Sequence, residues 1–218
     1  MRPVAIDFYC CAGGMTRGLQ SAGFYVIGVD NVQRDRYIGD DFILGDALVI
    51  GRSLISRTRP ALILGSPPCG SYSALRVSPG NKLNHGLLIP GTRAIFKASG
   101  IPYVIENVAG APVRKDVRLC GEMFGLSVLQ HRYFELGGWQ AASPPHPRHR
   151  GRVRGWRHGV WSDGPYIAAY GKGGGKGEIS EIQSAKGIYW TNDRVELCEA
   201  IPPAYGQWIG ERFLECQA

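Results

Sequence analysis

The N-terminal part of the chain repeats one local pattern, in which a short apolar run ends at a glycine, a proline or an acidic residue. Runs of this length that are rich in branched apolar residues are typical of buried strands. The runs are Val4–Tyr9, Tyr25–Val29, Phe42–Leu44 and Ala61–Leu64. Successive buried strands of this kind predict an α/β fold built on a parallel sheet. Because the carboxyl ends of parallel strands meet at one edge, we expect a ligand crevice there.

The residues that follow these runs suit a nucleoside ligand. The turn Cys10–Gly14 stands between the first run and a predicted helix, an arrangement that lets backbone N–H groups approach a ligand. Asp30 ends the second run, where an acid commonly bonds ribose hydroxyls, and Asp46 ends the third. A Walker-type lysine is absent, which argues against a triphosphate site. The missing G-x-G-x-x-G spacing argues against a nicotinamide dehydrogenase.

Two further sheet-edge residues could act chemically. The segment Gly65–Ser73 follows the fourth run, and its two prolines end the strand and place Cys69 at the lip of the sheet. Cys69 could be a nucleophile, although a free cysteine is more often a small buried hydrophobic residue. Glu106 ends a fifth run, Pro102–Val108. A salt-bridged structural glutamate is the alternative there, because an unpaired buried charge is costly.

The remaining chain predicts further elements and one appendage. Glycine and proline punctuate the segment 71–90, which is long for a connection in a compact domain. The segment Gly137–Gly164 is rich in Pro, Gly, Arg, His and Trp with little periodicity, and we expect an appendage there. The predicted elements are helices at Thr92–Ala98, Val195–Ala200 and Pro203–Leu214, a helical turn at Gly121–Leu126, and strands at Val117–Leu119, Gln130–Leu136 and Tyr166–Tyr170.

Charge favours a polyanionic partner. The 218 residues carry a net charge of +7, and the segment Arg148–His158 has five arginines and no acid. A solvated basic loop is the alternative for this segment.

Cysteine and histidine spacing does not predict a metal. The six cysteines form no C-x-x-C pair, so reduced thiols are expected. His146 and His149 stand three apart, but no second ligand pair with metal-site spacing follows, and we expect no metal site. No apolar run approaches membrane-spanning length, and Met1–Asp7 begins a strand rather than a signal peptide, which predicts a cytoplasmic protein without a membrane partner.

Six segments, taken in chain order, resemble the motifs of one family. The DNA (cytosine-5) methyltransferases, and their short phage-type members above all, carry similar segments in the same order, and the resemblance covers nearly the whole chain outside 137–164. The matching segments are Asp7–Gly14 (first cofactor motif), Asp30 and Asp46 (acids of the second and third motifs), Pro68–Ser73 (Pro-Cys motif), Glu106–Val108 (Glu-Asn-Val), Gln130–Arg132 (Gln-x-Arg) and Glu199–Pro203 (Asn-Ala-Val-Pro-Pro).

Four positions differ from the family's pattern. Cys11 stands where a glycine is usual in the first motif, and Gly70 replaces the glutamine after the nucleophile. Phe134 replaces the second arginine of the Gln-x-Arg-x-Arg pattern. Glu199 replaces an asparagine near the expected cofactor pocket, where an acid suits the positive sulfonium of S-adenosylmethionine.

The resemblance implies a Rossmann-like S-adenosylmethionine-dependent methyltransferase sheet with helices on both faces and a very small target-recognition segment. It implies a catalytic core at 1–136, a reduced target-recognition segment at 137–164, and a C-terminal part of the core at 165–218 that completes the cofactor site. Cofactor-binding residues by this resemblance are Tyr9, Cys11, Gly13, Gly14, Asp30, Asp46, Pro67, Glu199 and Ala200.

The implied activity is transfer of a methyl group to carbon 5 of a flipped-out cytosine in double-stranded DNA. Cys69 would attack carbon 6, Glu106 would hold the proton at ring nitrogen 3, and Arg132 would bond the ring carbonyl. The expected DNA contacts are Ser71, Ser73, Gln130, Arg148, Arg150, Arg152, Arg154 and Arg157. The short segment 137–164 predicts a short or relaxed recognition sequence, and base flipping requires no dimer, so we expect a monomer.

Two alternatives remain open at this stage. The same chemistry could act on RNA or on a free cytosine nucleotide, because tRNA-directed members of the family carry similar motifs. A non-catalytic DNA-binding protein could keep the fold, although the intact Cys69, Glu106 and Arg132 argue against it.

Overall fold

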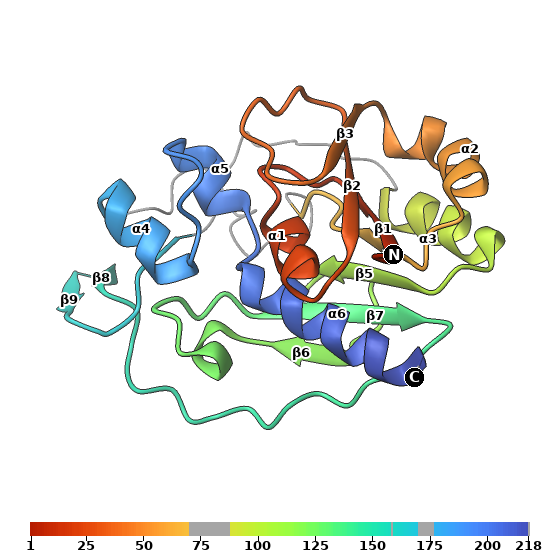
Figure 1. Ribbon diagram of the computed structural model, residues 1–218. Coiled ribbons are helices and arrows are strands. Elements are labelled where there is room, and N and C mark those ends of the chain that lie inside the picture. Colours follow the sequence, from red (N-terminus) through yellow and green to blue (C-terminus); the bar gives the residue numbers. More distant parts are fainter. Residues whose placement is uncertain (70–87, 158, 170–176, 218) are drawn as a thin grey trace.

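The computed structural model describes residues 1–69, 88–157, 159–169 and 177–217. A seven-stranded sheet forms its centre, and a separate two-stranded hairpin lies beyond the sheet (Figure 1). The sheet strands are β1 (Val4–Phe8), β2 (Tyr25–Asp30), β3 (Asp41–Leu44), β4 (Leu62–Gly65), β5 (Tyr103–Asn107), β6 (Val117–Leu119) and β7 (Arg132–Gly137), and the hairpin strands are β8 (Gly155–Arg157) and β9 (Val160–Ser162).

The sheet order β3-β2-β1-β4-β5-β7-β6 brings the functional motifs to one edge. Strands β1 to β5 are parallel, whereas β7 runs antiparallel to both β5 and β6. Phe8 pairs with Val29 of β2 and with Gly65 of β4, so these three strands end at the same level. Because β7 is antiparallel, Arg132 at its start lies at the edge where β5 ends.

Helices cover both faces of the sheet. The α-helices are α1 (Gly14–Ser21), α2 (Ala47–Thr58), α3 (Leu88–Ser99), α4 (Ile179–Lys186), α5 (Arg194–Glu199) and α6 (Pro203–Gln217), and a 3-10 turn, η2, spans Gly121–Phe124. Neighbouring strand residues point to opposite faces. Thus Ala5, Leu62 and Val104 pack against the side chains of α1 and α6. Ile6 and Ile63 pack on the other face, against those of α2 and α3. The expected three-layer α/β architecture is confirmed.

Glycines allow α1 and α6 to meet at backbone distance. A Cβ placed on Gly14 would lie 2.0 Å from the carbonyl oxygen of Ile201, and one on Gly18 would lie 2.0 Å from that of Pro203. On the facing helix, a Cβ on Gly206 would lie 2.4 Å from the carbonyl oxygen of Met15. The C-terminal segment therefore packs directly on the helix that follows the first turn.

The structure differs from the sequence prediction in several elements. Helices α2 and α4 and the β8–β9 hairpin were not predicted, and α3 begins at Leu88, earlier than expected. Pro90 lies in the first turn of α3, where its missing N–H costs nothing. The strand predicted at Tyr166–Tyr170 is wrong over its described residues, 166–169, which contribute only an isolated bridge from Tyr166 to Val153. Within the described ranges, no helix combines the length and apolarity that a membrane span requires.

Candidate functional site at the carboxyl edge of the sheet

Cys69 follows β4 at the carboxyl edge, and a side chain of β5 anchors the segment that carries it. The buried amide of Asn107 donates a hydrogen bond of 2.8 Å to the carbonyl oxygen of Pro67. The same side chain accepts a 3.0 Å bond from the backbone N–H of Val108. These two bonds fix the Pro67–Cys69 segment relative to Glu106, the neighbour of Asn107.

Glu106 and Arg132 form an ion pair beside this segment. The Nε atom of Arg132 lies 2.9 Å from Oε1 of Glu106, and the carboxylate is buried. The contact lacks hydrogen-bond geometry, and Oε1 has no hydrogen-bond partner among the described residues. The guanidinium is oriented by a 3.0 Å bond from Nη1 to the carbonyl oxygen of His131. A buried acceptor with a free lone pair at a sheet edge is available to a ligand.

The site favours protonated forms of its carboxyl and thiol groups. Burial raises the pKa of Glu106 above its ordinary value, while Arg132 and a hydrogen bond from Ser66 oppose that rise. Burial likewise raises the pKa of the Cys69 thiol; Arg132 opposes the rise, and Glu106 and Glu199 add to it. These interactions indicate that Cys69, Glu106 and Arg132 share one environment. Burial has a larger effect on the Cys69 thiol than the neighbouring Arg132.

The turn that follows β1 has left-handed backbone conformations at three of its residues. Tyr9, Cys11 and Gly13 all have positive φ angles, of 63°, 50° and 89°. A positive φ is strained for cysteine, whereas glycine adopts it freely. The N–H of Cys11 donates a 2.9 Å bond to Oδ2 of Asp30. Burial raises the pKa of the Cys11 thiol to about 11.

The acids predicted to bind the cofactor already have protein partners. Oδ1 of Asp30 accepts a 3.0 Å bond from the N–H of Val32 and lies 3.3 Å from the guanidinium of Arg34. A carboxylate has about four lone-pair positions, so Asp30 keeps capacity for one more donor. Asp46 caps α2 by accepting a 2.7 Å bond from the N–H of Leu48, and its side chain is otherwise exposed.

The C-terminal segment reaches this turn from the other side. The indole of Trp190 donates a 2.8 Å bond to the carbonyl oxygen of Ala12. The exposed Glu199 ends α5 and raises the pKa of both the Cys11 and Cys69 thiols, so its charge is felt on both sides of the site. Gly14, predicted to bind the cofactor, also lies close to the backbone of Ile201, which a Cβ at this position would meet.

Gln130 was predicted to contact DNA, but the structure gives its side chain a buried partner. Its amide donates a 3.1 Å bond to the carbonyl oxygen of Ala200, and its backbone has a φ of 31°. The buried ammonium of Lys186 donates to the same carbonyl at 2.5 Å and to that of Leu197 at 2.6 Å. Burial lowers the pKa of Lys186 to about 7. Gln130 and Lys186 together hold Ala200, which was predicted as a cofactor residue, against β7.

The arginines of the segment Arg148–His158, called the basic segment below, differ in their partners. Arg150 pairs with Glu122 at 2.8 Å and lies over the ring of Tyr166, and Arg154 pairs with Glu181 at 2.9 Å. Arg148 and Arg152 are exposed. Arg157 lies in β8. Ser71 and Ser73, also predicted to bind DNA, lie outside the described residues.

Four residues that matter here were not singled out from the sequence. Asn107 stood inside a quoted motif without a role, and Lys186 gave no signal because its carbonyl partners are tertiary. Trp156 and Trp161 form an edge-to-face pair on the hairpin, with rings 5.7 Å apart, and remain 61% and 50% exposed. Their alternation with arginine along the segment is the signal that could have marked them.

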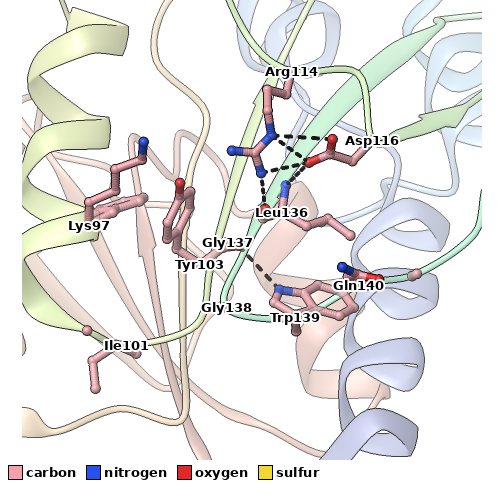
Figure 2. Close-up of a pocket in the computed structure, with 13 residues that line it drawn as sticks. Lys97, Ile101, Tyr103, Arg114, Asp116, Leu136, Gly137, Gly138, Trp139 and Gln140 are labelled. Atoms are coloured by element: carbon pink, nitrogen blue, oxygen red, sulfur yellow. Dashed lines mark hydrogen bonds and ion pairs between the residues drawn. The ribbon is translucent and has the colours of Figure 1, made fainter.

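A large hollow of about 940 Å³ lies elsewhere, at the opposite edge of the sheet (Figure 2). Its polar side chains bond one another: Arg114 pairs with Asp116 at 2.9 Å and with the carbonyl oxygen of Leu136, and Trp139 donates to the carbonyl oxygen of Tyr103 at 3.3 Å. Ligands of open α/β sheets bind at the carboxyl ends of the strands. The edge that carries Cys69 is therefore the stronger candidate.

Comparison with known proteins agrees with the fold. No family model matches the chain. The chain is 20% identical to the type II methyltransferase M.XorII of Xanthomonas oryzae pv. oryzae over 239 aligned positions, covering 95% of this chain and 53% of that enzyme, so it spans about half the length of this curated relative. The solved structure of the Dnmt2 methyltransferase of S. pombe aligns with a TM-score of 0.59 at 13% identity, over 98% of this chain and 99% of that one. The sheet and its helices thus share the Rossmann-like α/β fold of that structure.

Proposed function

We propose that this protein transfers the methyl group of S-adenosylmethionine to carbon 5 of cytosine in DNA, through a covalent adduct on Cys69. The observation that carries the proposal is the grouping of Cys69, Glu106 and Arg132 at the carboxyl edge, where the buried Oε1 of Glu106 is ion-paired with Arg132 but accepts no hydrogen bond from the described residues. The weak similarity to a type II methyltransferase along 95% of the chain supports it.

Each of the three residues has a distinct task in this chemistry. Carbon 5 of cytosine is a poor nucleophile. Attack by the Cys69 thiolate, formed when the thiol gives its proton to water, makes a bond from sulfur to carbon 6 and moves the electrons of the carbon 5–carbon 6 double bond into an enamine. Glu106 holds a proton at ring nitrogen 3, which offsets the negative charge produced by the attack. Its raised pKa suits this task, because the carboxyl group must be protonated near neutral pH. Arg132 bonds the ring carbonyl and keeps Glu106 oriented.

The chain's residues fit the proposed cofactor. S-adenosylmethionine, when bound, supplies an electrophilic methyl group on a positively charged sulfur. The remaining lone pair of Asp30 and the exposed carboxylates of Asp46 and Glu199 offer acceptors and negative charge for it. Transfer to carbon 5 would break the methyl group's bond to sulfur and leave neutral S-adenosylhomocysteine. Water would then take the carbon 5 proton, the electrons of that C–H bond would re-form the carbon 5–carbon 6 double bond, and Cys69 would leave carbon 6 as a thiolate while the nitrogen 3 proton returns to Glu106.

The proposed substrate is duplex DNA. A stacked cytosine cannot reach a buried carboxyl group, so the nucleotide must leave the helix at a cost of a few kcal/mol. The exposed Arg148 and Arg152 can neutralise phosphates, and the exposed Trp156 and Trp161 can stack on bases. The few side chains of this segment suit a short recognition sequence.

Transfer of tritium from methyl-labelled S-adenosylmethionine tests the proposal. Duplex DNA, RNA and dCMP are offered side by side to the wild type, to Cys69→Ser and to Cys216→Ser, which changes an exposed thiol far along the chain. We expect label in DNA with the wild type and Cys216→Ser, and none with Cys69→Ser. Label confined to RNA or dCMP would move the substrate, and label in none of the three would overturn the proposal.

A further inference from the structure

Four side chains that are scattered along the sequence converge beside β6 and β7. Cys120 is fully buried and follows β6, and His131 precedes β7. His146 and His149 come from the segment 138–152. One ligand atom from each of the four lies within 4.8 Å of all the others. The sequence prediction of no metal site considered only pairs that are close in the chain, and it did not anticipate that the second pair would be Cys120 and His131.

Two of the distances within the cluster are close to those of a tetrahedral metal site. With bonds of about 2.05 Å to nitrogen and 2.3 Å to sulfur, tetrahedral zinc separates two nitrogens by about 3.3 Å and a nitrogen from a sulfur by about 3.6 Å. Nε2 of His131 lies 3.0 Å from Nε2 of His146, and Sγ of Cys120 lies 3.5 Å from Nε2 of His149. The centroids of the three imidazole rings lie 4.9 to 5.2 Å apart.

We propose that Cys120, His131, His146 and His149 bind one zinc ion. One thiolate and three imidazoles are ligands that zinc accepts readily. Two separate hydrogen bonds, one within each close pair, would account for the two short distances. They do not require all four ligand atoms to converge, whereas a single ion does. Four protein ligands leave no open position, which is the mark of a structural rather than a catalytic zinc.

The ion would add an anchor to a segment without regular secondary structure. Residues 138–152 form neither helix nor strand, and Figure 1 shows this part as a long trace that passes around β6. Its other anchors include a 2.9 Å bond from the N–H of Arg118 to Ser143 and the ion pair between Arg150 and Glu122. The zinc would join this segment to His131, the residue whose carbonyl orients Arg132. The site therefore lies one residue from the proposed active site and holds the basic segment beside it.

Metal content and cobalt spectroscopy test the proposal on the full chain, purified without a histidine tag. We expect about one zinc per chain by elemental analysis. After removal of the metal, Co²⁺ should bind with a stoichiometry of one and give the intense visible bands of a tetrahedral site and a near-ultraviolet thiolate-to-cobalt band. Both readouts are independent of methyl transfer, so they distinguish failure of this proposal from failure of the proposed function.

Variants assign the ligands. Cys120→Ser should lose the thiolate-to-cobalt band. His149→Ala should weaken zinc binding by more than the ~10- to 100-fold that follows the loss of an outer partner of a metal ligand. Cys216→Ser changes a thiol outside the cluster and should bind metal as the wild type does. Wild-type protein that carries no zinc and gives no cobalt bands would show that the cluster is held by hydrogen bonds alone. Unchanged binding in Cys120→Ser and His149→Ala would equally overturn the assignment.

Discussion

Replacing Asn107 with alanine tests whether the end of β5 positions the proposed nucleophile. The change removes the 2.8 Å bond to the carbonyl oxygen of Pro67 and the 3.0 Å bond from the N–H of Val108. Pro67 is buried, so its carbonyl would lose its partner without gaining water. An unsatisfied buried acceptor costs about 1–3 kcal/mol, and the half-buried N–H adds a smaller amount. The expected loss of unfolding free energy is about 2–4 kcal/mol.

Urea unfolding and methyl-transfer kinetics measure the two consequences. A loss of this size lowers the melting temperature by roughly 2–4 °C per kcal/mol in a chain of this length. Because the bond also fixes Cys69 relative to Glu106, we expect kcat to fall by about 10- to 100-fold in the molecules that remain folded. Asn31→Ala, which changes an exposed asparagine after β2, is the matched control.

The reasoning would be refuted by an Asn107→Ala variant whose stability lies within ~0.5 kcal/mol of the wild type, the range of ordinary surface changes. A large loss of stability with unchanged kcat would refute the positioning role alone. In that case the Pro67–Cys69 segment would hold its place without the amide.

Four further predictions follow from other contacts. Gly14→Ala should destabilise the fold severely, because the new Cβ would lie 2.0 Å from the carbonyl oxygen of Ile201. Gly51→Ala in α2, where the nearest atom would lie 3.5 Å from the new Cβ, should instead stabilise the fold by about 0.5–1 kcal/mol. Thermal melting of the two variants distinguishes these outcomes. Glu106→Gln should keep the fold and lose about 10²- to 10⁴-fold in methyl-transfer rate, and wild-type activity in this variant would remove Glu106 from the mechanism. Burial raises the pKa of Asp7 to about 7. Ionisation of Asp7 should therefore lower the free energy of unfolding as the pH rises from about 4 to 7. Asp7→Asn should flatten that fall, and an unchanged pH profile of unfolding would contradict it. Arg148→Ala and Arg152→Ala should each reduce the slope of log binding constant against log salt concentration for DNA by about 1. Arg150→Ala and Arg154→Ala should reduce it by less, because Glu122 and Glu181 already pair with these arginines. Equal slopes in all four variants would contradict this.

The sheet could be predicted from the sequence because its central strands β1, β4 and β5 are buried on both faces. Runs such as Tyr25–Asp30 and Leu62–Gly65 are apolar without interruption and end at turn or acidic residues. Helix α2 was missed because its first turn, Ala47–Ile50, continues that apolar character without helical spacing, although Asp46 caps it. The hairpin β8–β9 was missed because its tryptophans face solvent and give no alternation.

The site was predictable to the extent that its residues lie in short segments. Cys69 lies shortly after β4 and Glu106 near the carboxyl end of β5, so their meeting at one edge follows from the parallel pairing of these strands. Contacts between distant segments could not be predicted in this way. The bond from Gln130 to Ala200 depends on how the C-terminal segment packs beside β7. The convergence of Cys120 with His149 depends on how the segment 138–152 passes the end of β6, and no local pattern encodes either contact.

A trapping experiment tests the proposed role of Cys69 most directly. Duplex DNA that carries 5-fluorocytosine is incubated with S-adenosylmethionine and the protein, and the products are separated under denaturing conditions. Because fluorine replaces the carbon 5 proton that must leave, the adduct formed by Cys69 cannot break down. We predict a protein–DNA adduct that survives denaturation with the wild type and is absent with Cys69→Ser. An adduct on another residue, or methyl transfer that persists without Cys69, would contradict the account.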